Sequence, residues 1–313
     1  MKKINNKILV VALLALVGLF VLLKMFRSPR LESNLRKELV VLDTAKVSEL
    51  RVAPASRKGE VVRLIREGRQ WMVEKEGKKW LADESSVKSV LGLLQKVEAQ
   101  RMVSRKKEKW DTYQVGENGT QVSVYYGTDL QANVHLGKSG FNQSTGGMYG
   151  GGAYTYVRLS DEDEVYVVDG FLETTFSRPF SDWRNRSFLR VPRDLVTKIS
   201  FRYPADSSFV LEKRDSVWLV DGTPADLQKV SNYLGHLAVK NLSGFADDFT
   251  TSASPDVQVT VEGAGATLAT IEGWKRDGDW VLRGPAQKEI YFSSRGSSAD
   301  KDLLIGKKQL LPQ

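Results

Sequence analysis

The feature that most constrains this chain is a run of sixteen residues without a charge, Ile8 to Leu23, close to its N-terminus. The run continues past Lys24 to Phe26. If the side chains of Lys7 and Lys24 reach back toward the headgroups, about twenty residues can cross a hydrocarbon core of roughly 30 Å. The run therefore predicts one transmembrane helix, which contacts the lipid bilayer through residues 8–26. Its apolar anchor positions are Ile8, Leu9, Leu13, Leu16, Phe20 and Leu23.

A cleaved signal peptide is the alternative for such a run, and it requires a small-residue cleavage site after the apolar stretch. Residues 24–30 are bulky and basic, which favours an uncleaved anchor. The sequence contains no cysteine, so a lipoprotein, which needs a cysteine to acylate, is excluded. Only seven residues precede the run. We therefore expect a signal anchor in the cell inner membrane, single-pass, with the C-terminal part on the extracytoplasmic (periplasmic) side.

The net charge of +8 lies almost entirely beside this apolar run. The first thirty residues contain six basic side chains and no acidic one, and the remainder has 40 basic and 38 acidic residues. A protein that binds nucleic acid needs its positive charge on the folded domain. The distribution argues against nucleic acid and is typical of a segment next to lipid headgroups. The six basic residues are Lys2, Lys3, Lys7, Lys24, Arg27 and Arg30.

The rest of the chain contains one order of elements twice. In each half three short segments with alternating apolar residues follow one another, and the third contains a tryptophan, Trp71 or Trp218. A helix pattern follows each of them, with apolar residues every three or four positions. The first helix begins after Asp83, and Thr223 and Pro224 are expected to cap the second. The apolar stripes are Val87, Val90, Leu91, Leu94 and Val97, and Leu227, Val230, Tyr233, Leu234 and Leu237.

The correspondence continues beyond the two helices. Residues 121–124 (Gln-Val-Ser-Val) match 258–261 (Gln-Val-Thr-Val), and two further apolar strands follow at 165–168 and 290–293. Short strands joined by glycine, asparagine and aspartate turns favour antiparallel sheet. We expect an α+β fold of two tandem repeats, each a mostly antiparallel β-sheet with one packed helix, preceded by the transmembrane helix. The expected domains are an anchor with basic flanks (1–30), a first repeat (31–190) and a second repeat (191–313).

Several of these segments resemble a known bacterial family. They are the tryptophan strand, the helix that starts at an aspartate, a Tyr-Val-Arg strand at 156–158 and a Val-Tyr-Val strand at 165–167. The chain resembles the family called domain of unknown function 4340 over roughly residues 45–310. The family's tyrosine-glycine-leucine turn corresponds to Tyr113-Gln114-Val115 here. The resemblance implies a single-pass envelope protein of the kind often encoded beside gliding-type ABC transporter components, with no established catalytic residues.

The sequence nominates no catalytic, cofactor or metal site. Residues 132–139 fit a relaxed phosphate-loop pattern, but they alternate like a strand and no helix start follows, so we expect a strand and a turn. The two histidines, His135 and His236, lack ligand-like spacing to each other or to carboxylates. The acidic run 161–164 lacks the spacing of a calcium loop and is expected to be a hairpin tip. The basic cluster at 101–109 is expected to be a solvated helix end or turn.

Aromatic residues in polar or glycine-rich surroundings are the expected partner contacts. Residues 146–152 contain five glycines with Met148 and Tyr149 between them, which is typical of a mobile hairpin loop that can also contact a ligand. Three tryptophans, Trp71, Trp218 and Trp280, lie in alternating strands and are expected in the core. The expected partner contacts are Met148, Tyr149, Tyr154, Trp80, Trp110 and Trp183.

These observations favour a non-enzymatic, membrane-anchored interaction or scaffolding subunit of a bacterial envelope complex, with the subunits of an ABC-type transporter as expected partners. Two alternatives stay open. One is an extracytoplasmic binding module for a glycan, lipid or peptide, in which exposed tryptophans would line a groove. The other is a hydrolase, which would need a convergent polar cluster around His135 or His236.

Overall fold

The computed structural model describes residues 36–141 and 152–312. The chain divides into two compact units, Met1–Arg178 (unit 1) and Pro179–Gln313 (unit 2). The predicted membrane anchor, Ile8 to Leu23, lies outside the described residues. Within the described ranges, no helix has the length and apolar character needed to cross a membrane.

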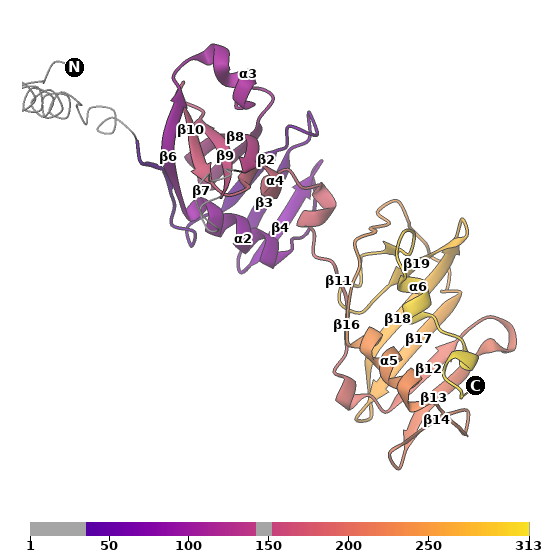
Figure 1. Cartoon of the computed structure of the whole chain (residues 1–313). Coiled ribbons are helices and arrows are strands. Elements are labelled where there is room, and N and C mark those ends of the chain that lie inside the picture. The colour runs from indigo at the N-terminus through magenta and orange to yellow at the C-terminus, as the bar shows by residue number, and fades with distance from the viewer. Residues whose placement is uncertain (1–35, 142–151, 313) are drawn as a thin grey trace, which may run out of the picture. The chain divides into compact units, whose positions relative to one another are not determined.

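Unit 1 is built on a ten-stranded sheet whose strands all pair in the antiparallel direction (Figure 1). The order across the sheet is β1-β6-β10-β9-β8-β7-β2-β3-β4-β5. The strands are β1 (Glu38–Val41), β2 (Glu49–Ala53), β3 (Val62–Glu67), β4 (Gln70–Lys75), β5 (Lys78–Leu81), β6 (Lys96–Ser104), β7 (Thr120–Tyr126), β8 (Asp129–Phe141), β9 (Ala153–Leu159) and β10 (Val165–Asp169).

The main helix of unit 1 is α2 (Glu84–Gln95), which begins where the sequence predicts. The Asp83 carboxylate accepts a hydrogen bond from the backbone N–H of Ser86 at 2.7 Å, and this cap satisfies one of the free amides of the first turn. Four residues of the predicted stripe, Val87, Val90, Leu91 and Leu94, are buried on the core side of α2, whereas the fifth, Val97, lies beyond the helix in β6. The shorter helical segments are η2 (Lys107–Lys109), α3 (Trp110–Tyr113) and α4 (Leu172–Phe176).

Unit 2 contains an eight-stranded antiparallel sheet and a separate two-stranded one, β11-β16. The order in the larger sheet is β15-β14-β13-β12-β17-β18-β19-β20. The strands are β11 (Ser187–Arg190), β12 (Lys198–Arg202), β13 (Phe209–Arg214), β14 (Val217–Val220), β15 (Thr223–Pro224), β16 (Val239–Asn241), β17 (Val257–Gly263), β18 (Ala266–Arg276), β19 (Asp279–Arg283) and β20 (Phe292–Ser293).

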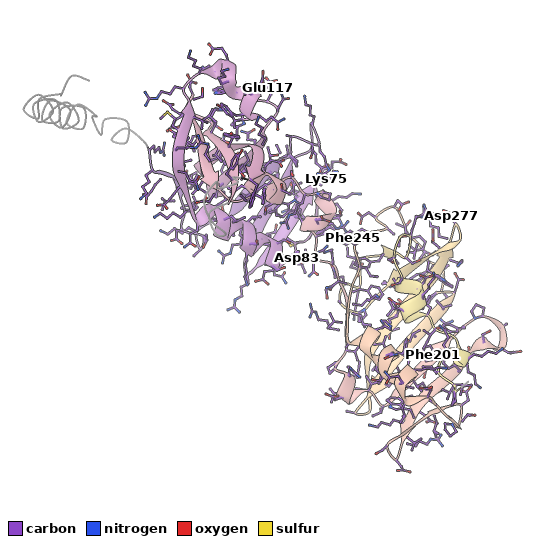
Figure 2. All side chains as sticks on the ribbon, in the orientation of Figure 1. Lys75, Asp83, Glu117, Phe201, Phe245 and Asp277 are labelled. Atoms are coloured by element: carbon purple, nitrogen blue, oxygen red, sulfur yellow. The ribbon has the colours of Figure 1, made fainter. Side chains whose placement is uncertain are left out.

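The helix α5 (Leu227–Ala238) packs its buried face on this sheet, and Figure 1 shows it lying across β12 and β17. Its residues Val230, Tyr233, Leu234 and Leu237 share one core with Phe201, which is labelled in Figure 2. The remaining helical segments of unit 2 are η3 (Phe180–Trp183), η4 (Arg193–Leu195), η5 (Ala205–Ser207), α6 (Ala299–Leu303) and η6 (Lys307–Gln309).

The predicted cap of α5 is wrong. Thr223 and Pro224 form the edge strand β15, which pairs with β14, and an edge strand tolerates proline because one side of it needs no backbone donor. The cap is Asp226, whose carboxylate accepts from the backbone N–H groups of Gln228 at 2.9 Å and Lys229 at 3.1 Å. The first residue of the predicted stripe, Leu227, is 64% exposed, so it does not join the core.

The structure confirms an α+β fold of mostly antiparallel sheet with few helices. Residues 179–190, which the sequence analysis assigned to the first repeat, belong to unit 2. There β11 pairs with β16, and Leu189 lies opposite Lys240. A pairing between residues so far apart in the sequence leaves no local signal for the boundary.

One glycine lies at the same position of each long helix, and its replacement tests the helix assignments. We expect Gly92→Ala and Gly235→Ala each to raise the free energy of unfolding by about 0.5–1 kcal/mol, because alanine restricts the unfolded chain more than glycine does. A Cβ atom at either position would have no neighbour within 4 Å. Urea denaturation followed by circular dichroism measures the change, and a loss of stability in either variant would contradict the assignment.

Candidate functional site

The face of the unit 1 sheet opposite α2 carries a row of three polar side chains across neighbouring strands. Gln121 on β7 lies opposite His135 on β8, and His135 lies opposite Arg158 on β9. Directly opposed residues of antiparallel strands project from the same face, so the three side chains are neighbours.

Arg158 is the charged residue of this row that is buried, with an exposed fraction of 4%. Its Nε donates to the carbonyl oxygen of Val115 at 2.9 Å, and its Nη1 donates to the carbonyl oxygen of Leu159 at 3.0 Å. Nη1 also donates to the carbonyl oxygens of Ser160 at 3.4 Å and Glu162 at 3.2 Å. Within residues 36–141 and 152–312, no carboxylate forms a hydrogen bond or ion pair with this guanidinium. Burial consequently lowers the pKa of Arg158, although the charge of Asp163 opposes that shift.

The segment that covers this guanidinium is α3. The centre of the Arg158 guanidinium lies 3.8 Å from the centroid of the Trp110 ring, and the indole N–H of Trp110 donates to the carbonyl oxygen of Asp163 at 3.1 Å. The contact is a cation–π interaction in a partly desolvated place, where such contacts are strongest. Together with the hydrogen bonds to the carbonyl oxygens, this contact fixes the plane of the guanidinium.

The close approach of α3 to the sheet depends on Gly137 in β8. A Cβ atom at this position would lie 2.1 Å from the carbonyl oxygen of Tyr113 and 2.7 Å from Cγ1 of Val115. The chain then turns at Gln114, which has a positive φ of 58°. This turn directs the Val115 carbonyl at Arg158, so a backbone feature positions the charged side chain.

His135 is half-buried beside Arg158. The pKa of His135 is lowered to about 4, mainly by burial and also by the neighbouring charge of Arg158, while a backbone hydrogen bond with Gly116 opposes both effects. His135 is therefore neutral at pH 7. Its Nδ1 atom is buried and has no hydrogen-bond partner among the described residues. A buried polar atom without a partner is costly, and in a cleft it is a group that a ligand can satisfy.

Arg158 and His135 lie at the wall of a cleft of about 810 Å³. Three basic and three acidic side chains line it, so its charge is nearly balanced. Fixed donors on Arg158, a free acceptor on His135 and a broad opening suit the binding of a polar ligand. The charged groups that line the cleft are Lys58, Lys107, Arg158, Glu60, Asp111 and Glu117. In the described ranges of the chain, no three histidine, cysteine or acidic side chains are grouped closely enough to hold a metal ion.

The corresponding row in unit 2 is Gln258–Glu272–Arg283. Gln258 on β17 lies opposite Glu272 on β18, and Glu272 lies opposite Arg283 on β19. Here the arginine has a carboxylate partner, because Arg283 Nε donates to Oε2 of Glu272 at 2.7 Å. Arg283 Nη1 also donates to the hydroxyl oxygen of Tyr291 at 3.2 Å. Although partial burial works against its charge, the hydrogen bond with Glu272 holds the pKa of Arg283 above its usual range.

The expected partner contacts have separate locations. Trp110 lines the cleft, whereas Trp80 is half-buried in β5, and Tyr154 packs edge-on against Tyr156 with ring centroids 5.4 Å apart. Trp183 was expected to be available to a partner, and that prediction is wrong because its side chain is fully buried. Its polar neighbours in η3 gave the misleading signal. Two further expected contacts, Met148 and Tyr149, lie outside the described residues.

The three tryptophans expected in the core are there. Trp71 and Trp218 are each 8% exposed, and Trp280 packs partly buried against the core of unit 2. The phosphate-loop-like residues 132–139 lie within β8, as expected for a strand.

The basic and acidic clusters of the sequence face each other in unit 1. Lys107 forms an ion pair with Asp163 at 3.4 Å, and Arg105 lies 3.9 Å from Glu164. All four side chains are partly or largely exposed, so these pairs contribute little to stability. The mutual pairing explains both clusters without a calcium ion or an external phosphate.

The sequence analysis gave Arg158 no role and named His135 only as a residue around which a hydrolase site would need to form. Arg158 belongs to the Tyr-Val-Arg strand on which the family resemblance rests, and His135 belongs to the phosphate-loop-like segment. A charged residue in an otherwise buried alternating strand was the available signal, because such a residue is rarely buried unless it has partners.

The titration of His135 gives a test of this geometry. In the unfolded chain the histidine takes up a proton near pH 6.5, whereas in the folded chain it does so only near pH 4. The unfolded state therefore binds more protons between these values, and stability falls as the pH drops from about 6.5 to about 4, by on the order of 2–3 kcal/mol. Urea denaturation at several pH values measures it, and His135→Gln should flatten this part of the profile. Equal slopes in both proteins would contradict the assignment.

Comparison with known proteins identifies the family of the chain. No curated protein and no solved structure matches it. One family model, described as a domain of unknown function (DUF4340), matches residues 73–259. That range begins in β4 and ends in β17, so it includes the whole Trp110–His135–Arg158 group and the helix α5. Because the match covers well over half of the 313 residues, the chain belongs to the DUF4340 family.

Proposed function

We propose that the chain is a non-enzymatic interaction subunit of a bacterial envelope complex, anchored in the inner membrane through residues 8–26 with both units on the periplasmic side. In this proposal it is an accessory component of an ABC-type transporter, and the two units are tandem repeats of one fold. The observation that carries the proposal is that each unit has a similar polar row, Gln–His–Arg in unit 1 and Gln–Glu–Arg in unit 2, on the open face of its sheet, which is the face opposite its long helix.

The helices support the tandem repeat residue by residue. Both α2 and α5 have twelve residues and an aspartate cap, Asp83 or Asp226. Their buried positions coincide in spacing, and the strand that follows begins directly after each helix. The buried positions are Val87, Val90, Leu91 and Leu94 in the first helix, and Val230, Tyr233, Leu234 and Leu237 in the second.

Irregularities of strand pairing support it further, because chance similarity between two sheets does not reproduce them. The pairings β1·β6 and β11·β16 each have one register shift, between Glu38 and Val40 and between Ser187 and Leu189. The pairings β7·β8 and β17·β18 each have one as well, after Val124 and after Val261.

A membrane anchor and a rigid polar surface together favour an interaction role. On the open face of unit 1, Arg63 donates to Glu49 at 2.7 Å and also to Glu74, and Arg51 donates to Glu49 at 2.7 Å. Burial raises the pKa of Glu49, but its hydrogen bonds to the two arginines outweigh that effect and lower it overall. Side chains already held in one arrangement lose less entropy when a partner binds. Confinement to the bilayer raises the effective concentration for a membrane partner.

The second candidate function is a binding module for a small ligand or peptide. The cleft of about 810 Å³ in unit 1 favours it, since this volume is in the range of ligand sites. The two functions are compatible when the bound group belongs to a protein partner.

Co-purification tests the proposed function. The full chain, tagged at its C-terminus and expressed at its native level, should recover the ATPase and permease subunits of a transporter from membranes in mild detergent. A chain without residues 1–30 is the matched control and should recover much less of them. Recovery of the full chain alone, or activity of a reporter fused after Gln313 only in the cytoplasm, would contradict the proposal.

A further inference from the structure

The two polar rows differ at one position, and that difference suggests what the cleft of unit 1 binds. The second residue of the row is Glu272 in unit 2 and His135 in unit 1. In unit 2 the chain itself supplies a carboxylate to the arginine of the row, with Arg283 Nη2 2.6 Å from Oε2 of Glu272. In unit 1 a neutral imidazole stands in the same place, and among the described residues the hydrogen bonds of Arg158 go to carbonyl oxygens of the main chain.

We propose that the cleft of unit 1 binds a carboxylate of an acidic protein segment, and that Arg158 receives it where Arg283 receives the carboxylate of Glu272. The inference rests on the proposed function, because the segment would belong to the partner protein.

The groups around Arg158 hold its guanidinium in place and leave one of its nitrogen atoms, Nη2, for such a ligand. Its guanidinium is held by carbonyl oxygens on the Nε and Nη1 side and by the Trp110 ring on one face, while Nη2 has no hydrogen bond to any described residue. A hydrogen bond between a guanidinium and a carboxylate is charge-assisted and roughly twice as strong as a neutral one. His135 lies directly opposite Arg158 and lines the same cleft, so its ring is close to a ligand bound there.

The charges of the cleft favour a carboxylate over a phosphate. Three basic groups, Lys58, Lys107 and Arg158, face three acidic groups of the same cleft wall. Lys107 is also paired with Asp163. Two cations, Lys58 and Arg158, then have no ion pair with a described carboxylate, and the three acids of the cleft repel a doubly charged phosphate more than a singly charged carboxylate. The volume of about 810 Å³ holds more than one carboxylate, which fits an extended peptide better than a free acid.

Histidine resonances report on the site, because the chain contains only two histidines. The full chain is prepared in detergent micelles with ¹³C-labelled histidine and titrated with acetyl-Gly-Glu-Gly-Gly-amide, with succinate and with inorganic phosphate. We expect the glutamate peptide, which carries a single carboxylate, to move the His135 signal saturably and to leave the exposed His236 unchanged. The peptide should bind more tightly than succinate. A response to phosphate alone, or none to either carboxylate up to about 10 mM, would overturn the proposal, because a contact with a Kd of about 1 mM saturates in that range.

Two reciprocal variants test the comparison between the units. His135→Glu gives unit 1 the carboxylate that unit 2 has, so peptide affinity measured by calorimetry should fall at least tenfold while the melting temperature is kept. Glu272→His removes the carboxylate from Arg283, so the stoichiometry should rise from one peptide to two. Unchanged affinity in a folded His135→Glu variant would overturn the proposal. If the wild-type chain binds the peptide but recovers no transporter subunit, the proposed function fails and the carboxylate site stands. If the transporter subunits are recovered but the peptide does not bind, the carboxylate site fails and the proposed function stands.

Discussion

Replacement of Phe201 by alanine should lower the free energy of unfolding of unit 2 by about 3–5 kcal/mol. Phe201 is 2% exposed, and its ring stacks on that of Phe209 with centroids 4.1 Å apart and an interplanar angle of 12°. The ring of Tyr233 on α5 lies 5.7 Å away. The variant leaves a cavity between sheet and helix, where neighbouring side chains relax only partly. It also removes the aromatic contacts, which add to the loss.

Hydrogen exchange of the β12 and β13 amides measures this loss within unit 2. The matched control is Val217→Ala, because Val217 lies in the same sheet and is 48% exposed, so its replacement should change stability by no more than about 0.5 kcal/mol. A loss below about 1 kcal/mol in the Phe201 variant would show that the helix does not pack on the sheet as described.

Replacement of Gly137 by valine should destabilise unit 1 by about 3 kcal/mol, at the upper end of the cost of overpacking. The nearest neighbour of an added Cβ atom is the backbone oxygen of Tyr113 at 2.1 Å, and a backbone atom has little freedom to move aside. The variant should push α3 away from β8, so that Trp110 leaves Arg158. Tryptophan emission should shift to longer wavelength as that indole becomes exposed, and peptide binding in the cleft should be lost.

Gly92→Val is the matched control for that variant. It introduces the same side chain in unit 1, but a Cβ atom at Gly92 has no neighbour within 4 Å, so its cost is that of helix propensity alone. Similar losses of stability in the two valine variants, with the emission of Trp110 unchanged in Gly137→Val, would contradict the close packing of α3 on β8.

The features of the fold that could be predicted are those with a local signal. The stripe of Val87, Val90, Leu91 and Leu94 predicts α2, because side chains three or four residues apart share one face of a helix. Alternation predicts the strands that contain Trp71 and Trp218, because each places its apolar side chains on one face of a sheet. Both kinds of pattern are complete within a dozen residues.

The features that could not be predicted depend on contacts between distant residues. The cap of α5 was misplaced because Thr223-Pro224 fits an N-cap sequence equally well, and only the pairing with β14 assigns it to a strand. The cleft combines His135 and Arg158, from the neighbouring strands β8 and β9, with Trp110 from the segment after β6. Their proximity depends on strand register and on Gly137, which lets α3 approach β8 closely. Neither feature has a local sequence pattern.

The two units differ in how firmly the last strand of each sheet is attached, and this affects how each one unfolds. In unit 1 the nine-residue β6 pairs with both β1 and β10, so the sheet is continuous from edge to edge. In unit 2 the three-residue β16 pairs only with β11 among the described strands, and the chain after it reaches β20 through a single bridge between Phe245 and Phe292. The β1–β6 and β11–β16 pairings each join three residue pairs, but in unit 1 the β1–β6 pair cannot leave the main sheet unless the pairing of β6 with β10 breaks as well. In unit 2 the β11–β16 pair forms a separate two-stranded sheet, so it can unfold while the eight-stranded sheet stays intact.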